Sequence, residues 1–397
     1  MKNMKTVEIK KGAKSLIEKH FYSIYSKWVK SDSSLSNGDF VKFLFNGEVI
    51  GYGFYEKIGS IGGRIISYIS EYDNPDLNEL IRWRVNQGYL IRKKIGEKKE
   101  RGYRLLYGDC DGTPGLITDV FNDTSVIQTT SYGWDRNLSL LADAIVKAGI
   151  SERVFLKNDQ RGRKFFGLPI EKKFLHGEPP PYTYIKEDDL IFKIDFLNGQ
   201  KTGFYLDQRE ARKKISSLSL DGAKILDLFS YTGSFSAHAL KAGASFSLLV
   251  DEDDRALNIA KENLIKNGFE DKFEIIRGRV EKVIDSLLIK KMQFDIVIVD
   301  PPAFIPSKNL YEKGIKAYKK LFGNTLRLVK LGGYIYASSC SFHLSSDELL
   351  KILQEWINYY GYKSRVIYEL SPFNVFPFTR PLDVELRYLK GFLLELE

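Results

Sequence analysis

The sequence is poor in the residues that build disulfides and metal sites. Its 397 residues include only two cysteines, Cys110 and Cys340, and neither lies in a context that suggests a bridge. Its four histidines are too scattered along the chain to indicate a metal site. No signal peptide and no apolar run of about 18 residues can be recognised. We therefore expect a cytoplasmic protein with reduced thiols and no bound zinc.

Negative charge is also in short supply. The chain has 60 Lys and Arg against 51 Asp and Glu, a net charge of +9. The surplus is concentrated in two stretches, residues 2–30 and 82–104, and aromatic residues are interleaved with the cations in both. This mixture favours a nucleic-acid partner, held by phosphate contacts and base stacking. The alternative is a pair of solvated helical faces with aromatic residues in the core. The cations are Lys2, Lys5, Lys10, Lys11, Lys14, Lys19, Lys27 and Lys30, then Arg82, Arg84, Arg92, Lys93, Lys94, Lys98, Lys99, Arg101 and Arg104.

One stretch, residues 225–236, combines an apolar strand, a turn of small residues and the start of a helix. In open α/β sheets such a turn offers backbone N–H groups to a ligand. Gly233 is the only glycine in the turn, so the three-glycine pattern of dinucleotide-binding loops is missing. Taken alone, the stretch is as consistent with a structural role as with a cofactor site.

Polar residues follow three further predicted strands. Asp251 ends the next apolar run, about 20 residues past the turn, where an acid would accept hydrogen bonds from ribose hydroxyls. Asp300 is followed by two prolines, which end its strand sharply. Residues 338–341 (Ser-Ser-Cys-Ser) follow the strand 334–337. The sequence predicts that these residues meet at the carboxyl edge of one sheet. Capping of a helix by Asp251 and of a strand end by Asp300 are the alternatives.

The second half of the chain alternates strands and helices, which predicts a mostly parallel, doubly wound α/β sheet. The first half reads as two β-rich units joined by a basic helix. The predicted strands lie at residues 39–45, 49–55, 63–69, 154–157, 225–228, 246–250, 273–277, 294–299, 334–337, 364–369 and 387–394, with a strand, a turn and a strand over 103–119. The predicted helices lie at 77–94, 138–148, 237–242, 254–265, from 280, at 311–329 and at 346–359.

Four segments together, residues 200–209, 226–233, 300–304 and 339–341, resemble the ribosomal RNA large-subunit cytosine-C5 methyltransferases. The first segment is the most specific match, and the resemblance covers nearly the whole chain. It implies a class I S-adenosylmethionine (SAM) methyltransferase domain over residues 189–397, with a Rossmann-like, mixed and mostly parallel sheet of seven strands. A PUA-like RNA-binding domain (1–75) and a middle α+β domain (76–188) would precede it. SAM is the implied cofactor and an unpaired region of large-subunit ribosomal RNA the implied partner, with a homodimer as one option for assembly.

The resemblance also implies which residues form the site. Arg209 would pair with the methionine carboxylate of SAM, a match of planar groups, although a plain surface arginine is the alternative. The implied cofactor contacts are Thr202, Tyr205, Asp207, Arg209, Phe229, Ser230, Gly233, Asp251 and Asp300.

The resemblance places the nucleophile at Cys340. Because cytosine C5 is a poor nucleophile, a thiolate must first add at C6 so that C5 can attack the sulfonium methyl group. Asp300, at a neighbouring strand end, would supply a hydrogen bond or proton to N3. The alternative for Cys340 is the commoner one, a buried and inert cysteine.

Two positions depart from the family pattern. Arg279 stands where the family usually has an acid that meets adenine, so backbone groups or an acid such as Glu281 would replace it. Ala303 stands where a lysine is usual. Three other functions remain open from the sequence. They are a SAM-dependent methyltransferase acting on a nitrogen of guanine or adenine, a nicotinamide-dependent oxidoreductase, and a non-catalytic RNA-binding protein.

Overall fold

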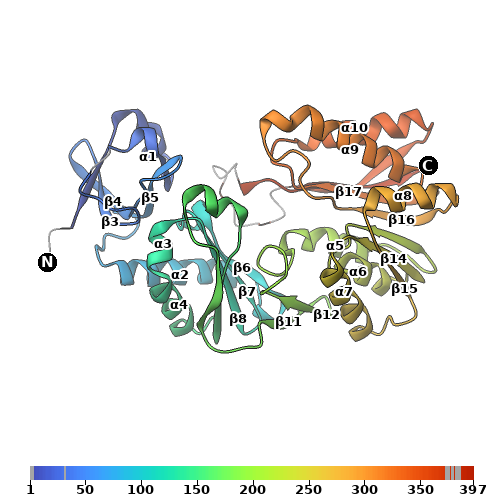
Figure 1. Ribbon diagram of the computed structural model, residues 1–397, viewed down its shortest axis with the longest axis horizontal. Helices are drawn as coiled ribbons and strands as arrows, with labels where there is room; N and C mark the ends of the chain where they lie inside the picture. Colours follow the sequence, from blue (N-terminus) through green and yellow to red (C-terminus); the bar gives the residue numbers. More distant parts are fainter. Residues whose placement is uncertain (1–3, 31–32, 372–375, 377–379, 381–385) are drawn as a thin grey trace. The chain divides into compact units, whose positions relative to one another are not determined.

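The computed structural model describes residues 4–30, 33–371, 376, 380 and 386–397, and the chain divides into two units (Figure 1). The first unit contains residues 1–187 and 194–204, and the second contains residues 188–193 and 205–397. The hairpin of β11 (Tyr182–Glu187) and β12 (Leu190–Asp195) lies where the chain passes from one to the other. Each unit has its own sheets and core.

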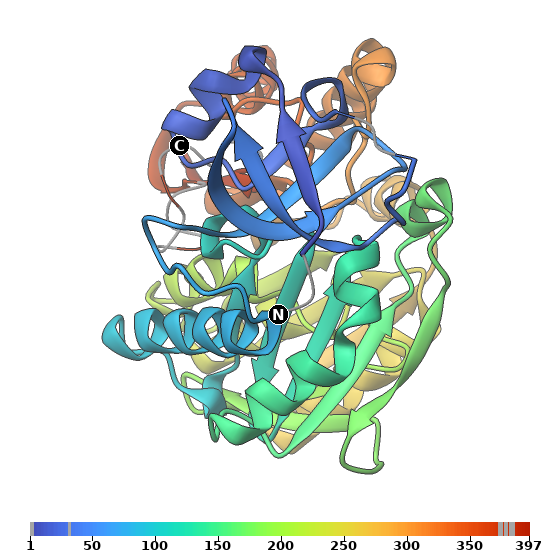
Figure 2. The ribbon, with the colours of Figure 1, turned by 90° about the vertical axis from the view of Figure 1, so that its left-hand side faces the viewer.

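The first sheet of the first unit consists of strands joined by tight turns. Asn46 and Gly47, both with positive φ, close the predicted hairpin. Phe43 and Ile65 are fully buried in the core of this sheet. The strands run in the order β1 (Thr6–Ile9), β3 (Phe40–Phe45), β4 (Glu48–Tyr55), β5 (Ile61–Tyr68) and β2 (Ser23–Tyr25), with one short helix, α1 (Lys14–Glu18) (Figure 2).

The second sheet of the first unit packs against helices α2 (Leu77–Lys94) and α4 (Leu138–Lys147). Helix α2 begins after Asp76, whose side chain accepts a hydrogen bond from the Glu79 N–H, and it ends with three basic residues that suit a helix carboxyl end. A further short helix is α3 (Tyr132–Arg136). The strand order is β10 (Glu171–His176), β9 (Arg153–Asn158), β8 (Thr124–Thr129), β7 (Leu116–Phe121) and β6 (Tyr103–Tyr107).

These two sheets share apolar packing. Phe54 and Ile66 of the first sheet belong to the same buried cluster as Trp134, and the Phe54 ring meets the Trp134 ring edge-on at 5.3 Å. Nearby, the Ser131 hydroxyl donates to Glu56 Oε1 at 2.5 Å. The expected boundary between residues 75 and 76 therefore falls within a single unit.

The second unit contains a seven-stranded sheet whose strands are parallel except at one end. From β15 to β17 all pairs are parallel, and β19 is antiparallel to both of its neighbours. Helices α5 to α7 cover one face and α8 to α10 the other (Figure 1). The strand order is β15 (Phe273–Arg277), β14 (Phe246–Asp251), β13 (Lys224–Leu228), β16 (Phe294–Val299), β17 (Val329–Ser339), β19 (Lys390–Leu396) and β18 (Ser364–Leu370), and the helices are α5 (Arg209–Ser216), α6 (Ser234–Lys241), α7 (Asp254–Lys266), α8 (Val280–Ile289), α9 (Tyr311–Leu326) and α10 (Ser346–Tyr359).

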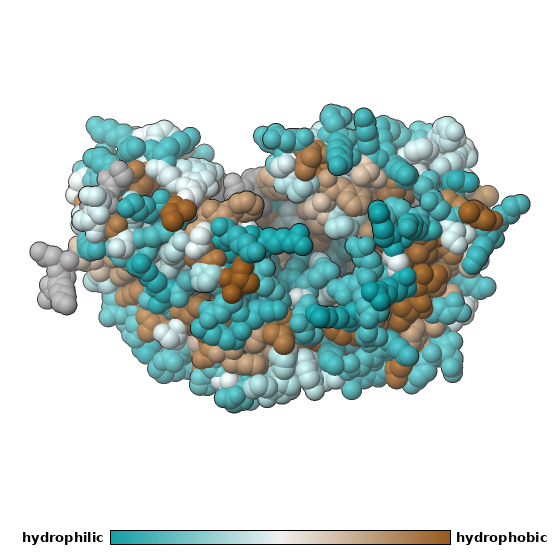
Figure 3. All heavy atoms as spheres, in the orientation of Figure 1, coloured by the Kyte–Doolittle hydropathy of each residue, from teal (hydrophilic) through white to brown (hydrophobic). Residues whose placement is uncertain are grey.

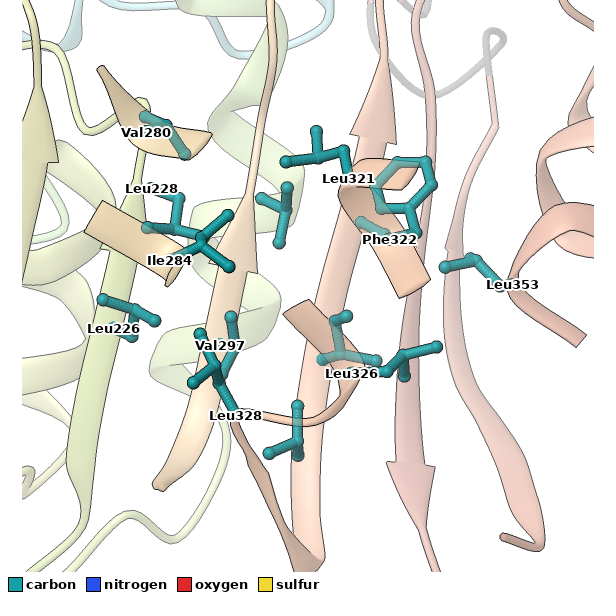
Figure 4. Close-up of a cluster of buried hydrophobic side chains, with 14 of the residues drawn as sticks. Leu226, Leu228, Val280, Ile284, Val297, Leu321, Phe322, Leu326, Leu328 and Leu353 are labelled. Atoms are coloured by element: carbon teal, nitrogen blue, oxygen red, sulfur yellow. The ribbon is translucent and has the colours of Figure 1, made fainter. Parts of the chain in front are cut away.

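The main core of the second unit lies between the sheet and helices α8 to α10 (Figure 4). Leu226 of β13 and Val297 of β16 are register partners in neighbouring strands, and both are fully buried there. Phe322 of α9 joins them in this cluster. Burying such side chains contributes about 1.5–3 kcal/mol each, so this layer fixes the position of the strand ends.

The predicted fold class is confirmed, because the sheet is mixed, mostly parallel and seven-stranded. The predicted strand over residues 334–337 is too short, since β17 begins at Val329, and the predicted last strand starts three residues too early. Strands β1, β2, β8, β10, β11 and β12 and helices α1, α3 and α5 were not predicted. Within the described ranges, no helix is long and apolar enough to cross a membrane.

Candidate functional site

The predicted site residues of the second unit gather at the carboxyl ends of its central strands. The loop 229–233 follows β13, Asp251 ends β14, Asp300 follows β16, and Cys340 follows β17. Because these four strands are parallel, their carboxyl ends share one edge of the sheet, the edge where open α/β folds bind ligands.

The loop after β13 has an unusual backbone. Phe229, Tyr231 and Gly233 all have positive φ, at 61°, 47° and 73°. Non-glycine residues in this region cost roughly 1–3 kcal/mol each and cluster at ligand sites. A Cβ on Gly233 would lie 3.0 Å from Leu249 Cδ2 and 3.1 Å from Ala260 Cβ. The glycine is therefore needed both for its φ and for close packing of the loop on β14 and α7.

Asp251 holds this loop in place. Its carboxylate accepts hydrogen bonds from the Tyr231 N–H and the Asp253 N–H, both at 2.9 Å. The helix α7 is capped by Asp253 instead, whose side chain accepts from the Arg255 and Ala256 N–H groups. The alternative that Asp251 serves as the helix cap is therefore wrong. A carboxylate offers about four lone-pair sites, so the two bonds leave capacity for ribose hydroxyls.

Asp227, inside β13, is a site residue that the sequence reasoning did not select. Its carboxylate accepts from the Ser236 N–H at 3.1 Å and from the Ser236 hydroxyl at 2.6 Å. Burial raises its pKa to about 7, and the charges of Asp300 and Asp251 act in the same direction. Three carboxyl groups thus converge at this edge, an environment that suits a cationic ligand. The available signal was an acid within an otherwise apolar strand.

Two buried hydroxyl groups in the loop fit a polar ligand. Ser230 is 6% exposed and Thr232 is 2% exposed, and neither side-chain oxygen has a hydrogen-bond partner among the described residues. Buried polar atoms without partners are uncommon in folded proteins. A bound group that supplies hydrogen-bond donors or acceptors would satisfy them, so the loop fits the polar amino-acid and ribose parts of SAM.

The segment before α5 lies beside the loop. The Tyr205 ring meets the Tyr231 ring edge-on at 5.2 Å. Asp207 is buried and accepts a hydrogen bond from the Tyr388 hydroxyl. Arg209, the first residue of α5, is only 9% exposed, so the alternative of a plain surface arginine is wrong.

Thr202 is the one predicted cofactor residue that the division of the chain assigns to the first unit. It belongs to the first unit, where its hydroxyl donates to Asp119 Oδ2 at 2.6 Å. The same carboxylate forms a buried ion pair with Arg104, at 2.8 Å from Nε. This hydrogen bond gives Thr202 a structural role within the first unit. Its contact with a cofactor stays a prediction.

Asp300 is held by a chain of polar side chains. The Ser338 hydroxyl donates to Asp300 Oδ1 at 2.5 Å, and Gln208 Nε2 lies 3.5 Å from the Ser338 oxygen. The Tyr336 hydroxyl in turn donates to Gln208 Oε1 at 2.8 Å. Burial raises the pKa of Tyr336 well above its ordinary value, and the charge of Asp300 adds to this. The carboxylate is thereby fixed in orientation at the end of β16.

Cys340 is the first residue after β17 and is only partly buried. Its Sγ lies 3.9 Å from the carbonyl oxygen of Pro301, the residue that follows Asp300. The Tyr318 hydroxyl lies between the hydroxyls of Ser339 (2.8 Å) and Ser341 (2.9 Å), which fixes the chain on both sides of the cysteine. A thiol at this position has the partial exposure of reactive cysteines and is not packed inside the core.

The two departures from the family pattern lie on the surface. Arg279 pairs with Glu281 at 3.6 Å, and both side chains are well exposed. Ala303 is exposed after the two prolines. Glu281, the acid proposed near adenine, therefore pairs with Arg279, and neither side chain is buried.

The two basic stretches differ from each other. In residues 82–104 the three arginines Arg84, Arg92 and Arg104 are buried, and each forms an ion pair, with Glu71, Asp111 and Asp119 respectively. The idea that the whole stretch contacts nucleic acid is therefore wrong for these three. The lysines of both stretches are exposed, apart from Lys2, which lies outside the described residues. Figure 3 shows that hydrophilic side chains dominate the visible surface of the first unit.

Comparison with known proteins agrees with this geometry. Residues 152–355 match the family model of S-adenosylmethionine-dependent methyltransferases, and residues 7–68 match that of the PUA-like domain. A crystal structure of SMU.776 in complex with SAH covers 99% of this chain and 100% of its own, with a TM-score of 0.79 at 20% identity. The protein is a class I SAM-dependent methyltransferase.

Sequence relatives narrow the family. A protein of Alteromonas mediterranea named ribosomal RNA large subunit methyltransferase I is 31% identical over 386 residues, 96% of each chain. A Methanocaldococcus jannaschii protein that is named a putative ribosomal RNA large subunit methyltransferase is 34% identical over 328 residues, 80% of this chain and 82% of its own. The chain belongs to the family of the ribosomal RNA large subunit methyltransferases I. This membership excludes the nicotinamide-dependent oxidoreductase.

Proposed function

We propose that the protein methylates C5 of a cytosine in large-subunit ribosomal RNA, with Cys340 as the nucleophile. One observation carries this proposal. The partly exposed thiol of Cys340 follows β17, and Asp300 follows the adjacent strand β16, beside the loop that fits SAM. Methyl transfer to a ring nitrogen needs no thiol at this position. The names of the relatives support ribosomal RNA as the substrate.

The residues around the loop would hold the cofactor. SAM supplies an electrophilic methyl group on a sulfonium ion. Asp251 would accept hydrogen bonds from the ribose hydroxyls, while the guanidinium of Arg209 would pair with the carboxylate. The hydroxyl of Ser230 and the backbone at Gly233 would contact the amino-acid part, with Phe229, Tyr205 and Asp207 completing the pocket. The other predicted contacts all belong to the second unit. Thr202 belongs to the first unit, so its position does not support a contact with the cofactor.

Cys340 and Asp300 would act on the base. The thiolate sulfur adds to C6 of cytosine, and the electron pair of the C5–C6 double bond becomes available at C5 for attack on the methyl group. Asp300, in its protonated form, donates a hydrogen bond or its proton to N3, where negative charge builds up. Loss of the C5 proton to a base then re-forms the C5–C6 double bond and expels the thiolate.

The exposed lysines of the first unit would hold the RNA. They lie outside the cofactor unit, and ammonium groups on a surface bind phosphates at long range. Because the target base must leave its stack to reach Cys340, an unpaired region is the easier substrate. An enzyme with this substrate would work in the cytoplasm. We retain residues 1–75, 76–188 and 189–397 as the proposed functional division.

The test is the methylated nucleoside itself. We expect Cys340→Ala to reduce methyl transfer by several powers of ten while SAM affinity stays within a few fold. Cys110→Ala is the matched control, because Cys110 is also a partly buried cysteine outside any disulfide but lies in the first unit. Mass spectrometry of digested ribosomal RNA should show 5-methylcytosine with wild type and Cys110→Ala only. A methylated guanine or adenine, or Cys340→Ala retaining more than about a tenth of the activity, would refute the proposal.

A further inference from the structure

A buried lysine is hydrogen-bonded to the turn that follows Cys340. Lys390 is the first residue of β19 and is only 3% exposed. The antiparallel register pairs it with Ser339, the residue before the cysteine. Its Nζ donates hydrogen bonds to the carbonyl oxygens of Ser341 and Leu344, both at 2.6 Å. The ammonium group therefore links the first and the last residue of the turn 341–344.

The charge of this ammonium group needs compensation, because the side chain is buried. In the part of the chain that the structure describes, Lys390 forms no ion pair, although buried charges are costly unless paired. Burial lowers the pKa of Lys390 to about 8, and the charges of Cys340 and Glu348 act in the opposite direction. The Glu348 carboxylate is already engaged, since it accepts hydrogen bonds from Ser345 and Tyr311. The cysteine sulfur is the other anion that can compensate the lysine.

Among the described residues, the remaining titratable groups near the sulfur provide no buried cation. Tyr318, from α9, contacts the residues on both sides of Cys340, and its pKa is raised by burial and further by the charge of Cys340. Asp300 lies at the end of the neighbouring strand β16 and is acidic. His343 follows in the turn and stacks edge-on against Phe342, with ring centroids 5.3 Å apart. Among the described residues around Cys340, Lys390 is thus the one buried amine.

We propose that Lys390 is the positioning residue that keeps Cys340 as a thiolate, because its ammonium group is hydrogen-bonded to the turn 341–344, which directly follows Cys340. The thiol proton is released to solvent, and Lys390 remains protonated as the counter-ion. A neighbouring ammonium charge lowers the pKa of a thiol, and this attraction must outweigh burial, which disfavours both charged forms. The inference rests on the proposed function in one respect, namely that this thiolate attacks the base.

The test measures thiolate formation without RNA or methyl transfer. The full chain is alkylated with iodoacetamide across pH 5.5 to 10, and the modification of Cys340 and Cys110 is quantified by peptide mass spectrometry. We expect the alkylation midpoint of Cys340 in wild type to lie below the ordinary thiol value of about 8.5. Lys390→Met should raise it by about one unit or more, whereas Lys390→Arg should leave it nearly unchanged. The midpoint of Cys110 should not move in either variant.

The shape of the pH profile separates this role from a purely structural one. A loosened turn would change the alkylation rate at all pH values without moving the midpoint. At a pH well below both midpoints, a rise of one unit lowers the thiolate fraction about tenfold, and the gain in nucleophilicity returns about threefold, so the rate falls about threefold. A wild-type midpoint at or above about 8.5, or an unchanged midpoint in Lys390→Met, would overturn the inference. Should Lys390→Met fail to fold, the wild-type and Lys390→Arg midpoints decide it.

Failure of this inference can be distinguished from failure of the proposed function. If the alkylation midpoint depends on Lys390 but Cys340→Ala still methylates RNA, the lysine–thiolate pair exists and the proposed nucleophile is wrong. If Cys340→Ala is inactive but the midpoint does not depend on Lys390, the nucleophile stands and the role of Lys390 is refuted.

Discussion

Arg92 and Lys93 are neighbours in the same basic helix, yet the structure predicts opposite effects when they are replaced. Arg92 Nη1 and Nη2 lie 2.5 and 2.6 Å from the two oxygens of Asp111, and Nε donates to the Arg104 carbonyl at 2.8 Å. Its side chain is 1% exposed and that of Asp111 is 3% exposed. Lys93 is exposed. One residue is part of the core and the other is available to RNA.

Removal of one partner from a buried ion pair costs about 3–5 kcal/mol, because it leaves an uncompensated charge. Arg92→Met should therefore lower the free energy of unfolding of the first unit by about that amount. The Tyr107 N–H, which also donates to Asp111 at 2.7 Å, would keep the cost near the lower end. Lys93→Gln should change stability by less than about 0.5 kcal/mol, as exposed substitutions usually do.

The assay combines urea unfolding with RNA binding over a salt series. For folded Arg92→Met, the slope of log affinity against log salt should equal that of wild type. If Lys93 binds a phosphate of single-stranded RNA, Lys93→Gln should lower the slope by about 0.7. The reasoning is refuted if Arg92→Met keeps wild-type stability and lowers the salt slope. Deletion of residues 1–75 is a poorer test, since it would uncover the core around Trp134.

Three further predictions concern the cofactor edge. Asp251→Ala should weaken SAM binding by about 1–3 kcal/mol in calorimetry, and an unchanged affinity would exclude the ribose role. The folded-state pKa of Asp227 is raised from 3.8 to about 7, so its contribution to stability is complete below pH 4 and is lost as pH rises to 7. Relative to wild type, Asp227→Asn should therefore gain up to about 4 kcal/mol between pH 4 and 8 in thermal unfolding, and a constant difference would contradict the buried acid. Gly233→Ala should lower stability by roughly 1–2 kcal/mol from its φ alone, more if Leu249 and Ala260 cannot move apart, and unfolding at wild-type temperature would show that the loop adapts.

The strand ends of the second unit were predictable because their signals are local. An apolar run that stops at an acid, a proline pair or a small-residue turn marks both the strand and its end, and β15, β16 and α10 match their predicted ranges. Parallel order then brings these ends together without further information. Asp251, Asp300 and Cys340 could thus be selected without knowing any contact between them.

Burial of polar residues was not predictable in the same way. Arg84, Arg92 and Arg104 look like the surface lysines beside them, and only their distant acid partners make them part of the core. Asp227 was overlooked for the same reason, since the serine that satisfies it comes from the following helix. The number of charged residues describes composition only. Whether a charged side chain is buried depends on its ion-pair and hydrogen-bond partners, which composition does not reveal.

Lys390 shows what the sequence could not supply even with the site in view. It stands in the run Tyr388 to Gly391 as an ordinary lysine before an apolar strand, far along the chain from Cys340. The antiparallel pairing of β17 with β19 brings Lys390 beside the end of the strand that Cys340 follows. Strand β19 runs antiparallel to β17. Its first residue therefore lies at the same edge of the sheet as the last residues of the parallel strands. A residue at the start of an antiparallel strand can therefore reach the catalytic edge of such a sheet, and a search confined to carboxyl ends overlooks it.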